Sequence, residues 1–367
     1  MTSSEATKPL RICIVTDAWL PQINGVVRTL TETRRELEAL GHSVLMITPQ
    51  SFRTLPCPTY PDIRLSWFPG RKVAAMLDEF APDALHIATE GPLGWAARGH
   101  ALRSKMRFTT AYHTRFPEYV RARFGFPLSW TYAVMRCFHG PADRVMVPTQ
   151  VVRRDLEAVG FRNVVLWSRG VDVEIFSPNP AGENPRDFLK ETRPIFLYVG
   201  RVAIEKNVED FLRLDLPGTK WVVGEGPALA DLKRRYREAH YAGVFPQSEL
   251  ARFYAAADVF VFPSRTDTFG LVLLEALACG LPVAAYPVTG PIDVIGDSGA
   301  GALNDDLRSA CLQALEIPRE RARAHAMTFS WAEAARQFTG HLRPMSYPMA
   351  PTGPSSSLDI VATRKPT

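Results

Sequence analysis

Short apolar runs alternate with helical patterns along most of the chain. Runs such as residues 11–16, 194–199 and 259–262 are bounded by polar residues, glycine or proline. Uninterrupted apolar runs of this length are typical of strands that are buried on both faces of a parallel sheet. After several of them, leucine, valine and alanine recur at helical spacing until a glycine ends the segment. The pattern predicts an α/β protein built from βαβ units.

The length and one polar stretch predict how the chain is divided. The 367 residues are enough for two domains of ordinary size. Residues 168–178, SRGVDVEIFSP, are polar, contain a glycine and end in proline, which is typical of a connection between domains. We expect a first domain at 1–168, a second at 169–330 and a final helix at 331–343. The proline- and serine-rich residues 344–367 are expected to be disordered.

Two acidic residues occupy unusual positions in the unit at 259–285. Asp267 lies in the loop after a predicted strand, and Glu275 lies about two turns later in an apolar helix, so both fall on nearly the same face. Ligands of open α/β sheets bind beyond the carboxyl ends of strands, and Gly270 lets the backbone come close to a ligand. Two interpretations are open. The pair binds sugar hydroxyls at a helix start that favours phosphate, or Asp267 caps the helix and Glu275 faces solvent.

Cations and glycines follow other predicted strands. Arg201 and Lys206 stand after a strand of the second domain, where they either clamp a diphosphate or are ordinary surface cations. Gly224 and Gly226 follow the next strand and permit close backbone approach. Gly25 begins a helix, where a phosphate can bind backbone amides. The first βα turn lacks the G-x-G-x-x-G pattern, which argues against a dinucleotide enzyme.

One histidine lies where ligands of such sheets bind. Tyr112 ends the predicted strand at 108–112, and His113 and Arg115 follow it. A single histidine is more often structural than functional, so the position alone leaves both interpretations open.

The stretch TDTFGLVLLEALACGLPV, which contains Asp267 and Glu275, resembles the donor-binding segment of retaining glycosyltransferases of family 4. The resemblance extends from about Arg11 to Phe338. It implies the GT-B fold, in which two Rossmann-like parallel-sheet domains face a central cleft and the last helix crosses back to the first domain. The family usually has glutamate where this chain has Asp267, and the shorter side chain leaves the sugar preference open.

The resemblance also assigns roles to residues. PQINGV matches the family's P-x-x-N-G-V loop, and GRVAIEKN matches its G-R-x-x-x-x-K-N segment. The implied catalytic residues are His113, Arg201, Lys206 and Asp267. The implied donor-binding residues are Gly25, Arg201, Lys206, Gly224, Gly226, Phe245, Asp267, Phe269, Gly270, Leu271 and Glu275. The implied acceptor-side residues are Asn24, Tyr112, His113 and Arg115.

The same resemblance implies a reaction. A nucleotide-diphosphate sugar binds mainly to the second domain, and Arg201 and Lys206 stabilise the departing diphosphate. The acceptor hydroxyl attacks from the same face through an oxocarbenium-like state, so no residue is assigned as nucleophile. No Asp-x-Asp occurs in the chain, so neither a metal nor another cofactor is expected. The nucleobase, uracil or guanine, stays open because the family binds it through backbone groups.

Three motifs bear on the acceptor. YHTRFPEY, WSRGVD and TDTFG together resemble transferases that glycosylate diacylglycerol with UDP-activated glucose, glucuronate or sulfoquinovose. GDP-mannose-dependent mannosyltransferases, which act on lipid or saccharide acceptors, share much of the same sequence. Transfer to a membrane lipid is therefore expected, with mannosyl transfer as the alternative. From other classes, a sugar-nucleotide epimerase, a phosphorylase and a non-catalytic lipid- or nucleic-acid-binding module stay open.

A basic and aromatic segment, residues 98–136, indicates a surface for a partner. Its only acid is Glu118, its aromatics include Phe116 and Trp130, and the whole chain carries a formal charge of +5. Either the segment docks on anionic lipid headgroups, or its aromatics are core residues beneath a solvated helix face. Nucleic acid is not expected as a partner because no nucleic-acid fold signature accompanies the segment.

Cysteine usage and the first residues bear on location. The five cysteines are scattered and form no Cys-x-x-Cys, which is typical of a reduced compartment. The first residues lack an apolar leader, and no apolar run approaches the roughly 20 residues that span a bilayer. We expect a cytoplasmic protein that is peripheral on the inner face of the cell membrane.

Overall fold

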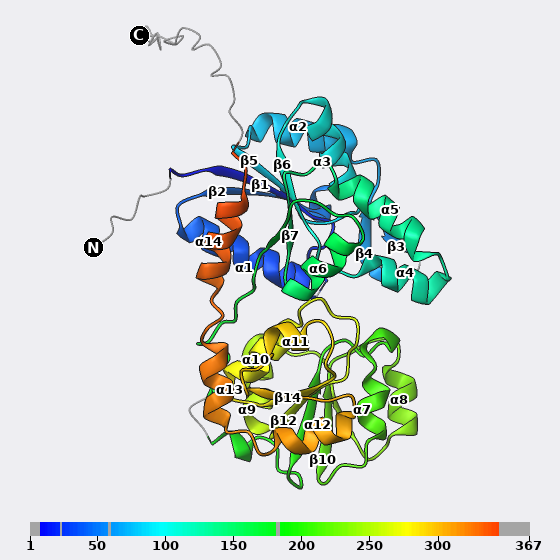
Figure 1. Ribbon diagram of the computed structural model, residues 1–367, viewed down its shortest axis with the longest axis vertical. Helices are drawn as coiled ribbons and strands as arrows, with labels where there is room; N and C mark the ends of the chain where they lie inside the picture. Colours follow the sequence, from blue (N-terminus) through cyan, green and yellow to red (C-terminus); the bar gives the residue numbers. More distant parts are fainter. Residues whose placement is uncertain (1–7, 23, 58–59, 181–183, 345–367) are drawn as a thin grey trace, which may run out of the picture.

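The computed structural model describes residues 8–22, 24–57, 60–180 and 184–344. Two parallel sheets, each with its own helices, follow one another along the long axis of the molecule (Figure 1). The predicted α/β class with two parallel-sheet domains is confirmed. The tail predicted to be disordered lies outside the described residues, except for Pro344.

Within the described residues, the first domain is built on a six-stranded sheet whose neighbouring strands are all parallel. Its spatial order is β2 (Ser43–Ile47), β1 (Arg11–Val15), β5 (Ala84–Ile87), β6 (Phe108–Ala111), β7 (Arg144–Val147) and β8 (Val164–Leu166). The order reverses at β1, since the chain passes from β1 to β2 on one side and later to β5 on the other. Open α/β sheets bind ligands beyond such a reversal.

Helices cover both faces of this sheet (Figure 1). They are α1 (Gly25–Ala39), α2 (Gly70–Phe80), α3 (Pro92–Arg103), α4 (Phe116–Phe124), α5 (Leu128–His139) and α6 (Gln150–Ala158). Successive residues of β1 show the two faces: Cys13 packs in one apolar cluster with Leu77 of α2, and Ile14 packs in another with Leu30 of α1. Burial on both faces is the reason that these strands are continuous apolar runs.

The second domain repeats this plan with a different strand order. The order is β11 (His240–Ala242), β10 (Thr219–Val223), β9 (Ile195–Val199), β12 (Val259–Phe262), β13 (Val283–Ala285) and β14 (Gly301–Leu303), again all parallel. The reversal lies at β9. The helical segments are η2 (Pro185–Asp187), η3 (Ile204–Lys206), α7 (Val208–Arg213), α8 (Leu229–Arg235), α9 (Gln247–Ala256), α10 (Leu271–Ala278), α11 (Pro291–Val294), α12 (Leu307–Ala314) and α13 (Arg319–Ala326).

The last helix, α14 (Trp331–His341), lies against α1 of the first domain (Figure 1). Phe338 is fully buried in the cluster that contains Leu30 and Leu37 of α1. Trp167, just after β8, donates its Nε1–H to the Ala334 carbonyl at 3.1 Å. The described part of the chain therefore passes through the second domain and returns to the first. Within the described ranges, no helix is long and apolar enough to cross a membrane.

The proline- and aromatic-rich sequence of residues 50–71 predicts a loop with one strand at 63–66, and the structure differs in part because that strand is longer and has a partner. The structure has the short η1 (Pro49–Ser51) and then an antiparallel hairpin of β3 (Thr54–Cys57) and β4 (Tyr60–Ser66). The prolines in this region interrupt the apolar pattern that marks a strand. A separate two-stranded hairpin tolerates them because a strand edge leaves some N–H groups unused.

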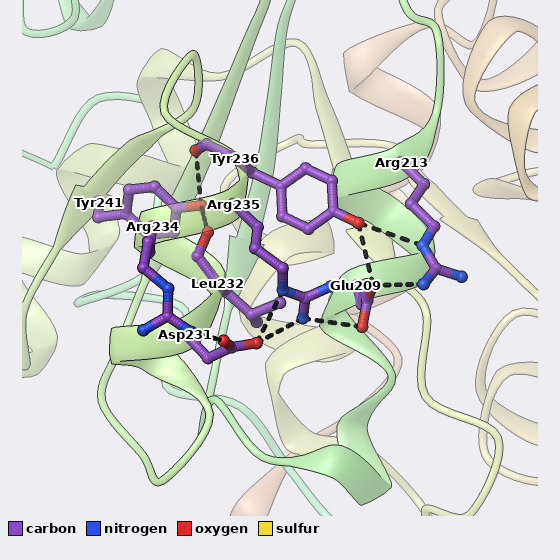
Figure 2. Close-up of polar contacts among 8 residues, drawn as sticks. All are labelled: Glu209, Arg213, Asp231, Leu232, Arg234, Arg235, Tyr236 and Tyr241. Atoms are coloured by element: carbon purple, nitrogen blue, oxygen red, sulfur yellow. Dashed lines mark hydrogen bonds and ion pairs between the residues drawn. The ribbon is translucent and has the colours of Figure 1, made fainter.

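A charged network links α7 and α8 at the surface of the second domain (Figure 2). Arg235 and Arg213 both pair with Glu209, and Tyr236 OH donates to Glu209 Oε1 at 3.0 Å. The hydrogen bond from Arg235, with those of Tyr236 and Arg213, lowers the pKa of Glu209 to about 2. The two arginine side chains are 40% and 63% exposed, so solvent screens these pairs.

Candidate active site

Loops that follow strands of the two sheets meet between the domains. Thr268 Oγ1, in the loop after β12, donates to the carbonyl oxygen of His113, after β6, at 2.7 Å. The backbone N–H of Val151 in α6 donates to Asp293 Oδ1 in α11 at 3.0 Å. The carboxyl ends of both sheets therefore face each other. The loops that line the predicted cleft touch one another in this structure.

One ion pair joins two loops at the carboxyl end of the second sheet. Lys206 Nζ, in η3 after β9, pairs with Asp267 Oδ1, after β12. Burial alone lowers the pKa of Lys206, but the charge of Asp267 and the nearby Tyr119 and Glu205 outweigh burial, so the pKa is raised. Lys206 is therefore charged at neutral pH. Asp267 Oδ2 is shielded from solvent and has no hydrogen-bond partner among the described residues.

The start of α10 shows that Asp267 is not a helix cap. The N-cap position is Gly270, which has φ of 85°, and no side chain caps the first turn. A left-handed φ at this position favours glycine. The interpretation of Asp267 as a simple cap is therefore wrong.

Glu275 is a buried carboxylate, only 4% exposed. Its Oε2 accepts from Tyr254 OH at 2.9 Å, and its Oε1 pairs with Arg28 Nη1 of α1 in the other domain. The interpretation of Glu275 as a solvent-facing residue is therefore wrong. A buried carboxylate needs partners of this kind because burial without them is costly.

Arg28 is a residue of this region that the sequence analysis missed. It lies in the first turn of α1, and its guanidinium lies 5.1 Å from the ring centroid of Phe176 as well as against Glu275. The two ion-pair partners are 247 residues apart in the chain. No local motif marks the pair, because it exists only through the approach of the domains.

The starts of α1 and α10 are neighbours across the domain boundary. A Cβ on Gly25 would lie 3.6 Å from Leu271 Cδ1, which is ordinary van der Waals contact. Asn24, predicted on the acceptor side, caps α1, since its Oδ1 accepts from the N–H groups of Val26 and Val27, both at 3.0 Å. Gly25 and Leu271, both predicted to bind the donor, are thus brought together.

The positions of Gly224 and Gly226 require glycine because of close backbone packing. Their φ values are 137° and 158°, and a Cβ on each would lie only 2.0 Å from Gly200 O and 2.2 Å from Val202 O. The loops after β9 and β10 therefore pack so closely that only glycine fits. Arg201 lies exposed in the first of these loops, where its carbonyl accepts from Tyr198 OH at 2.8 Å.

His113 is half-buried where these loops meet. Its Nδ1 lies 3.4 Å from Arg169 Nη2, and its Nε2 is shielded from solvent and without a partner among the described residues. Burial, with the charge of Arg169, lowers the pKa of His113 well below 6.5. The imidazole is therefore neutral at physiological pH.

Two family models match the chain, one in each domain. Glycosyltransferase Family 4 matches residues 23–175, and Glycosyl transferases group 1 matches residues 182–315. A GDP-mannose-dependent alpha-mannosyltransferase of Mycobacterium tuberculosis is 31% identical over 80% of this chain and 83% of its own length. The chain belongs to glycosyltransferase family 4.

Further relatives and one solved structure extend the comparison. A sulfoquinovosyl transferase of Arabidopsis thaliana is 30% identical over 80% of this chain, which spans 63% of that relative's length. An alpha-monoglucosyldiacylglycerol synthase of Streptococcus pneumoniae is 28% identical over 83% of this chain and 78% of its own. Sucrose-phosphate synthase from Thermosynechococcus elongatus has a TM-score of 0.73 at 22% identity, covering 90% of this chain and 97% of that one. The last likeness shows the shared GT-B fold.

Tyr112 of this family 4 transferase does not fit its predicted acceptor-side role. It is 1% exposed, and its ring lies in an apolar cluster with Tyr132 and with Phe161, whose ring centroid is 6.4 Å away. Successive residues of an extended segment point to opposite sides, so when His113 faces Trp167, Tyr112 faces the core under α5. Its side chain therefore has a packing role.

Arg115 holds the two domains of the transferase together. Its Nη2 bonds to Asp155 Oδ2 at 2.5 Å in the first domain and to Thr289 Oγ1 at 2.8 Å in the second. An acceptor contact by Arg115 would have to share the guanidinium with these partners.

Phe269 and Phe245, both predicted at the donor site, differ in how deeply they are buried. Phe269 is 7% exposed and belongs to the main core cluster of the second domain. Phe245 is half-buried, with its ring centroid 5.1 Å from that of Phe253. Phe269 therefore presents little more than backbone to a ligand.

The basic segment at 98–136 is less open than its composition indicates. Arg98 donates to the carbonyls of Phe138 and Cys137, and Arg136 donates to that of Val159. Several aromatic side chains are exposed instead, at 52%, 51% and 69%: Phe116, Phe126 and Trp130. The segment thus presents exposed aromatic groups at α4, at the start of α5 and between them, and two of its arginines are bound to backbone carbonyls.

Proposed function

We propose that this transferase moves a sugar from a nucleotide-diphosphate sugar to a membrane lipid such as diacylglycerol, with retention of the anomeric configuration. The observation that carries the proposal is that the Lys206–Asp267 pair adjoins the Thr268–His113 contact between the domains. A charged pair in one domain and a neutral ring in the other suit a charged donor and a neutral acceptor. The names of the plant and streptococcal relatives support the lipid acceptor.

Lys206 and Arg201 hold the donor diphosphate in this proposal. Negative charge accumulates on the departing nucleoside diphosphate, and cations fixed beforehand stabilise it without reorganisation. Lys206 supplies a point charge, and Arg201 supplies a planar fork that suits phosphate oxygens. Lys206 is held in place by Asp267, so it is oriented before the donor arrives.

The two carboxylates bind hydroxyl groups of the donor. Asp267 Oδ2 has no partner among the described residues and accepts from a sugar hydroxyl. Glu275 accepts from the ribose. Because Glu275 Oε1 pairs with Arg28, ribose binding requires Arg28 to move or to share that oxygen.

The proposed reaction needs no metal, because Lys206 and Arg201 supply the positive charge at the diphosphate. We expect dialysis against EDTA to leave turnover unchanged, and added Mg²⁺ to give no increase. The measurement is nucleoside diphosphate release at saturating donor. Loss of activity with EDTA and recovery with Mg²⁺ would contradict this part of the proposal.

A peripheral position on the inner face of the membrane brings the enzyme to its acceptor. Phe116 of α4, Trp130 of α5 and Phe126 in the turn between these helices are exposed, and aromatic rings of this kind partition to the membrane interface. The formal net charge of +5 adds attraction to anionic headgroups.

Transfer of mannose from GDP-mannose is the second candidate. The mycobacterial mannosyltransferase, at 31% identity, favours it. The donor is thus the property on which the two candidates differ.

The experiment uses purified full-length protein and a membrane lipid extract, with UDP-glucose, UDP-glucuronate and GDP-mannose in separate reactions. Lipid products are identified by mass spectrometry. The control variants are Glu275→Ala at the site and Glu333→Ala on the exposed face of α14, where Glu333 pairs with Arg336.

A hexosyl or hexuronosyl diacylglycerol made by the wild type and by Glu333→Ala, but not by Glu275→Ala, is the expected result. A mannolipid made from GDP-mannose would favour the second candidate. Release of nucleoside diphosphate without any lipid product would keep the transferase and reject the lipid acceptor.

A further inference from the structure

Arg169, in the connection after β8, is a buried guanidinium with an unusual set of partners. It is 3% exposed, and its Nη1 donates to the carbonyls of Trp167 at 2.6 Å and Ser168 at 3.0 Å. Its guanidinium carbon lies 4.1 Å from the ring centroid of Trp167. Burial lowers the pKa of Arg169 to about 9, so it stays charged at neutral pH. Its fixed partners are thus carbonyls and a ring.

The connection that carries Arg169 is fixed against α14. Trp167 Nε1 donates to Ala334 O at 3.1 Å, and the N–H of Ser168 donates to Gln337 Oε1 at 3.0 Å. A Cβ on Gly170 would lie 2.2 Å from the Trp331 nitrogen, so the chain packs closely on both sides of Arg169. The guanidinium is therefore held in one place.

The second arm of Arg169 faces His113. Arg169 Nη2 lies 3.4 Å from His113 Nδ1. A guanidinium has N–H donors and no acceptor, so the ring nitrogen that faces it must carry the lone pair. In a neutral imidazole the proton is then on the other nitrogen, Nε2, which has no partner among the described residues.

Together with burial, the charged and titratable groups around His113 lower its pKa and so disfavour the doubly protonated ring. Besides Arg169, they are His86 of β5 and His139 of α5. Burial lowers the pKa of His86 to about 3, and its Nδ1 bonds to Thr109 Oγ1 at 2.9 Å. Trp167 packs against the His113 ring with a centroid separation of 5.8 Å, and Thr268 of the second domain bonds to the His113 carbonyl.

We propose that Arg169 is a positioning residue that fixes His113 as the neutral Nε2–H tautomer. His113 then donates a hydrogen bond from Nε2 to a hydroxyl oxygen of the transferred sugar and does not act as a proton acceptor. The identity of the sugar as the partner rests on the proposed function. The tautomer does not, since it follows from the contact with Arg169 in the protein alone.

The test is an NMR measurement of the imidazole nitrogens in ¹⁵N-histidine-labelled full-length protein without substrate. The chain has 8 histidines, and His113→Gln assigns the signal of His113 by its loss. The variants are Arg169→Met, which removes charge and donor, and Arg169→Lys, which keeps the charge and loses the fork. Arg336→Met, an exposed arginine of α14 paired with Glu333, is the matched control.

In the wild type and in Arg336→Met we expect His113 to stay in the neutral Nε2–H form from about pH 8 to about pH 5. In Arg169→Met we expect a mixture of tautomers and a titration that moves toward the ordinary histidine pKa of about 6.5. Arg169→Lys keeps the low titration but loses the single tautomer. It also keeps the test open if Arg169→Met does not fold.

An Nδ1–H signal in the wild type, or unchanged His113 signals in both Arg169 variants, would overturn the proposal. In the transfer assay, Arg169→Met should lower kcat about tenfold, as expected for one lost hydrogen bond, and should move the acid limb of the kcat/KM profile to higher pH. If no transfer is found for any protein, the proposed function fails and the NMR result still decides the role of Arg169.

Discussion

The two domains contribute opposite kinds of chemistry to the place where they meet. On the side of the second domain, Lys206 is paired with Asp267, and Glu275 is buried with Arg28 and Tyr254 as its partners. On the side of the first domain, His113 is kept neutral by burial and by Arg169. The difference teaches that a charged ion pair lies where an anionic diphosphate would bind, whereas the ring that would face a sugar hydroxyl is held neutral by burial and by the fixed charge of Arg169.

Replacing Lys206 should give the largest effect, since it removes the fixed cation of the charged side. We expect Lys206→Ala to lower kcat/KM about 100-fold or more, because one preorganised charge at a departing group is worth about 3 kcal/mol. The measurement is steady-state release of nucleoside diphosphate. The control is Lys233→Ala, an exposed lysine 5.6 Å from the ring centroid of Tyr241. An equal fall of kcat/KM in both variants would contradict a specific role of Lys206 at the diphosphate.

Replacing Arg28 should lower the stability of the protein, because Arg28 is the ion-pair partner of the buried Glu275. Arg28→Met leaves Glu275 buried with Tyr254 as its one remaining side-chain partner within the described ranges, and breaking a buried ion pair from one side costs about 3 kcal/mol in the free energy of unfolding. The control on the same helix is Arg34→Met. Its pair with Glu38 spans 2.8 Å, with side chains 45% and 44% exposed, so we expect almost no change. Denaturant unfolding measures both, and a similar loss in the two variants would contradict the buried pair.

Replacing His86, a buried neutral histidine of the first domain, should change how the stability of the protein depends on pH. The folded pKa of His86 is about 3, below its ordinary value of 6.5. Between these values the unfolded chain takes up a proton and the folded chain does not, so the free energy of unfolding falls as the pH is lowered. The loss from this group is about 2 kcal/mol by pH 5.

His86→Gln cannot take up that proton, and its amide can still bond to Thr109. We therefore expect its thermal midpoint to fall less than that of the wild type between about pH 7.5 and about pH 5, as followed by circular dichroism. Parallel curves for the two proteins would mean that His86 is not held neutral in the folded state.

Much of the fold could be predicted from the sequence because its strands are buried on both faces. All five residues of β9 are buried, so the strand is a plain apolar run. β11 and β3 were missed and β4 was predicted only at 63–66, since the residues of β11 are only half-buried and prolines interrupt the hairpin. Local patterns report local burial, whereas β11 is stabilised by pairing with β10 and the two strands of the hairpin by pairing with each other.

The sequence predicted those site residues that lie within a recognisable local motif. Lys206 and Asp267 follow neighbouring strands of one sheet, and the structure pairs them. Arg28 was missed because its partner lies in the other domain. Tyr112 was misassigned because a motif gives the position of a residue along the chain and not the side of the sheet that it faces.

The most direct test of the contrast between the domains is the binding of UDP and GDP, measured by isothermal titration calorimetry, to the wild type, Lys206→Met and His113→Ala. The account predicts that Lys206→Met weakens binding of the preferred nucleotide by about tenfold or more, as expected for a lost charge-assisted hydrogen bond. It predicts that His113→Ala binds the nucleotide like the wild type and loses turnover only. Weaker binding in His113→Ala, or unchanged binding in Lys206→Met, would contradict the division of the site into a charged donor side and a neutral acceptor side.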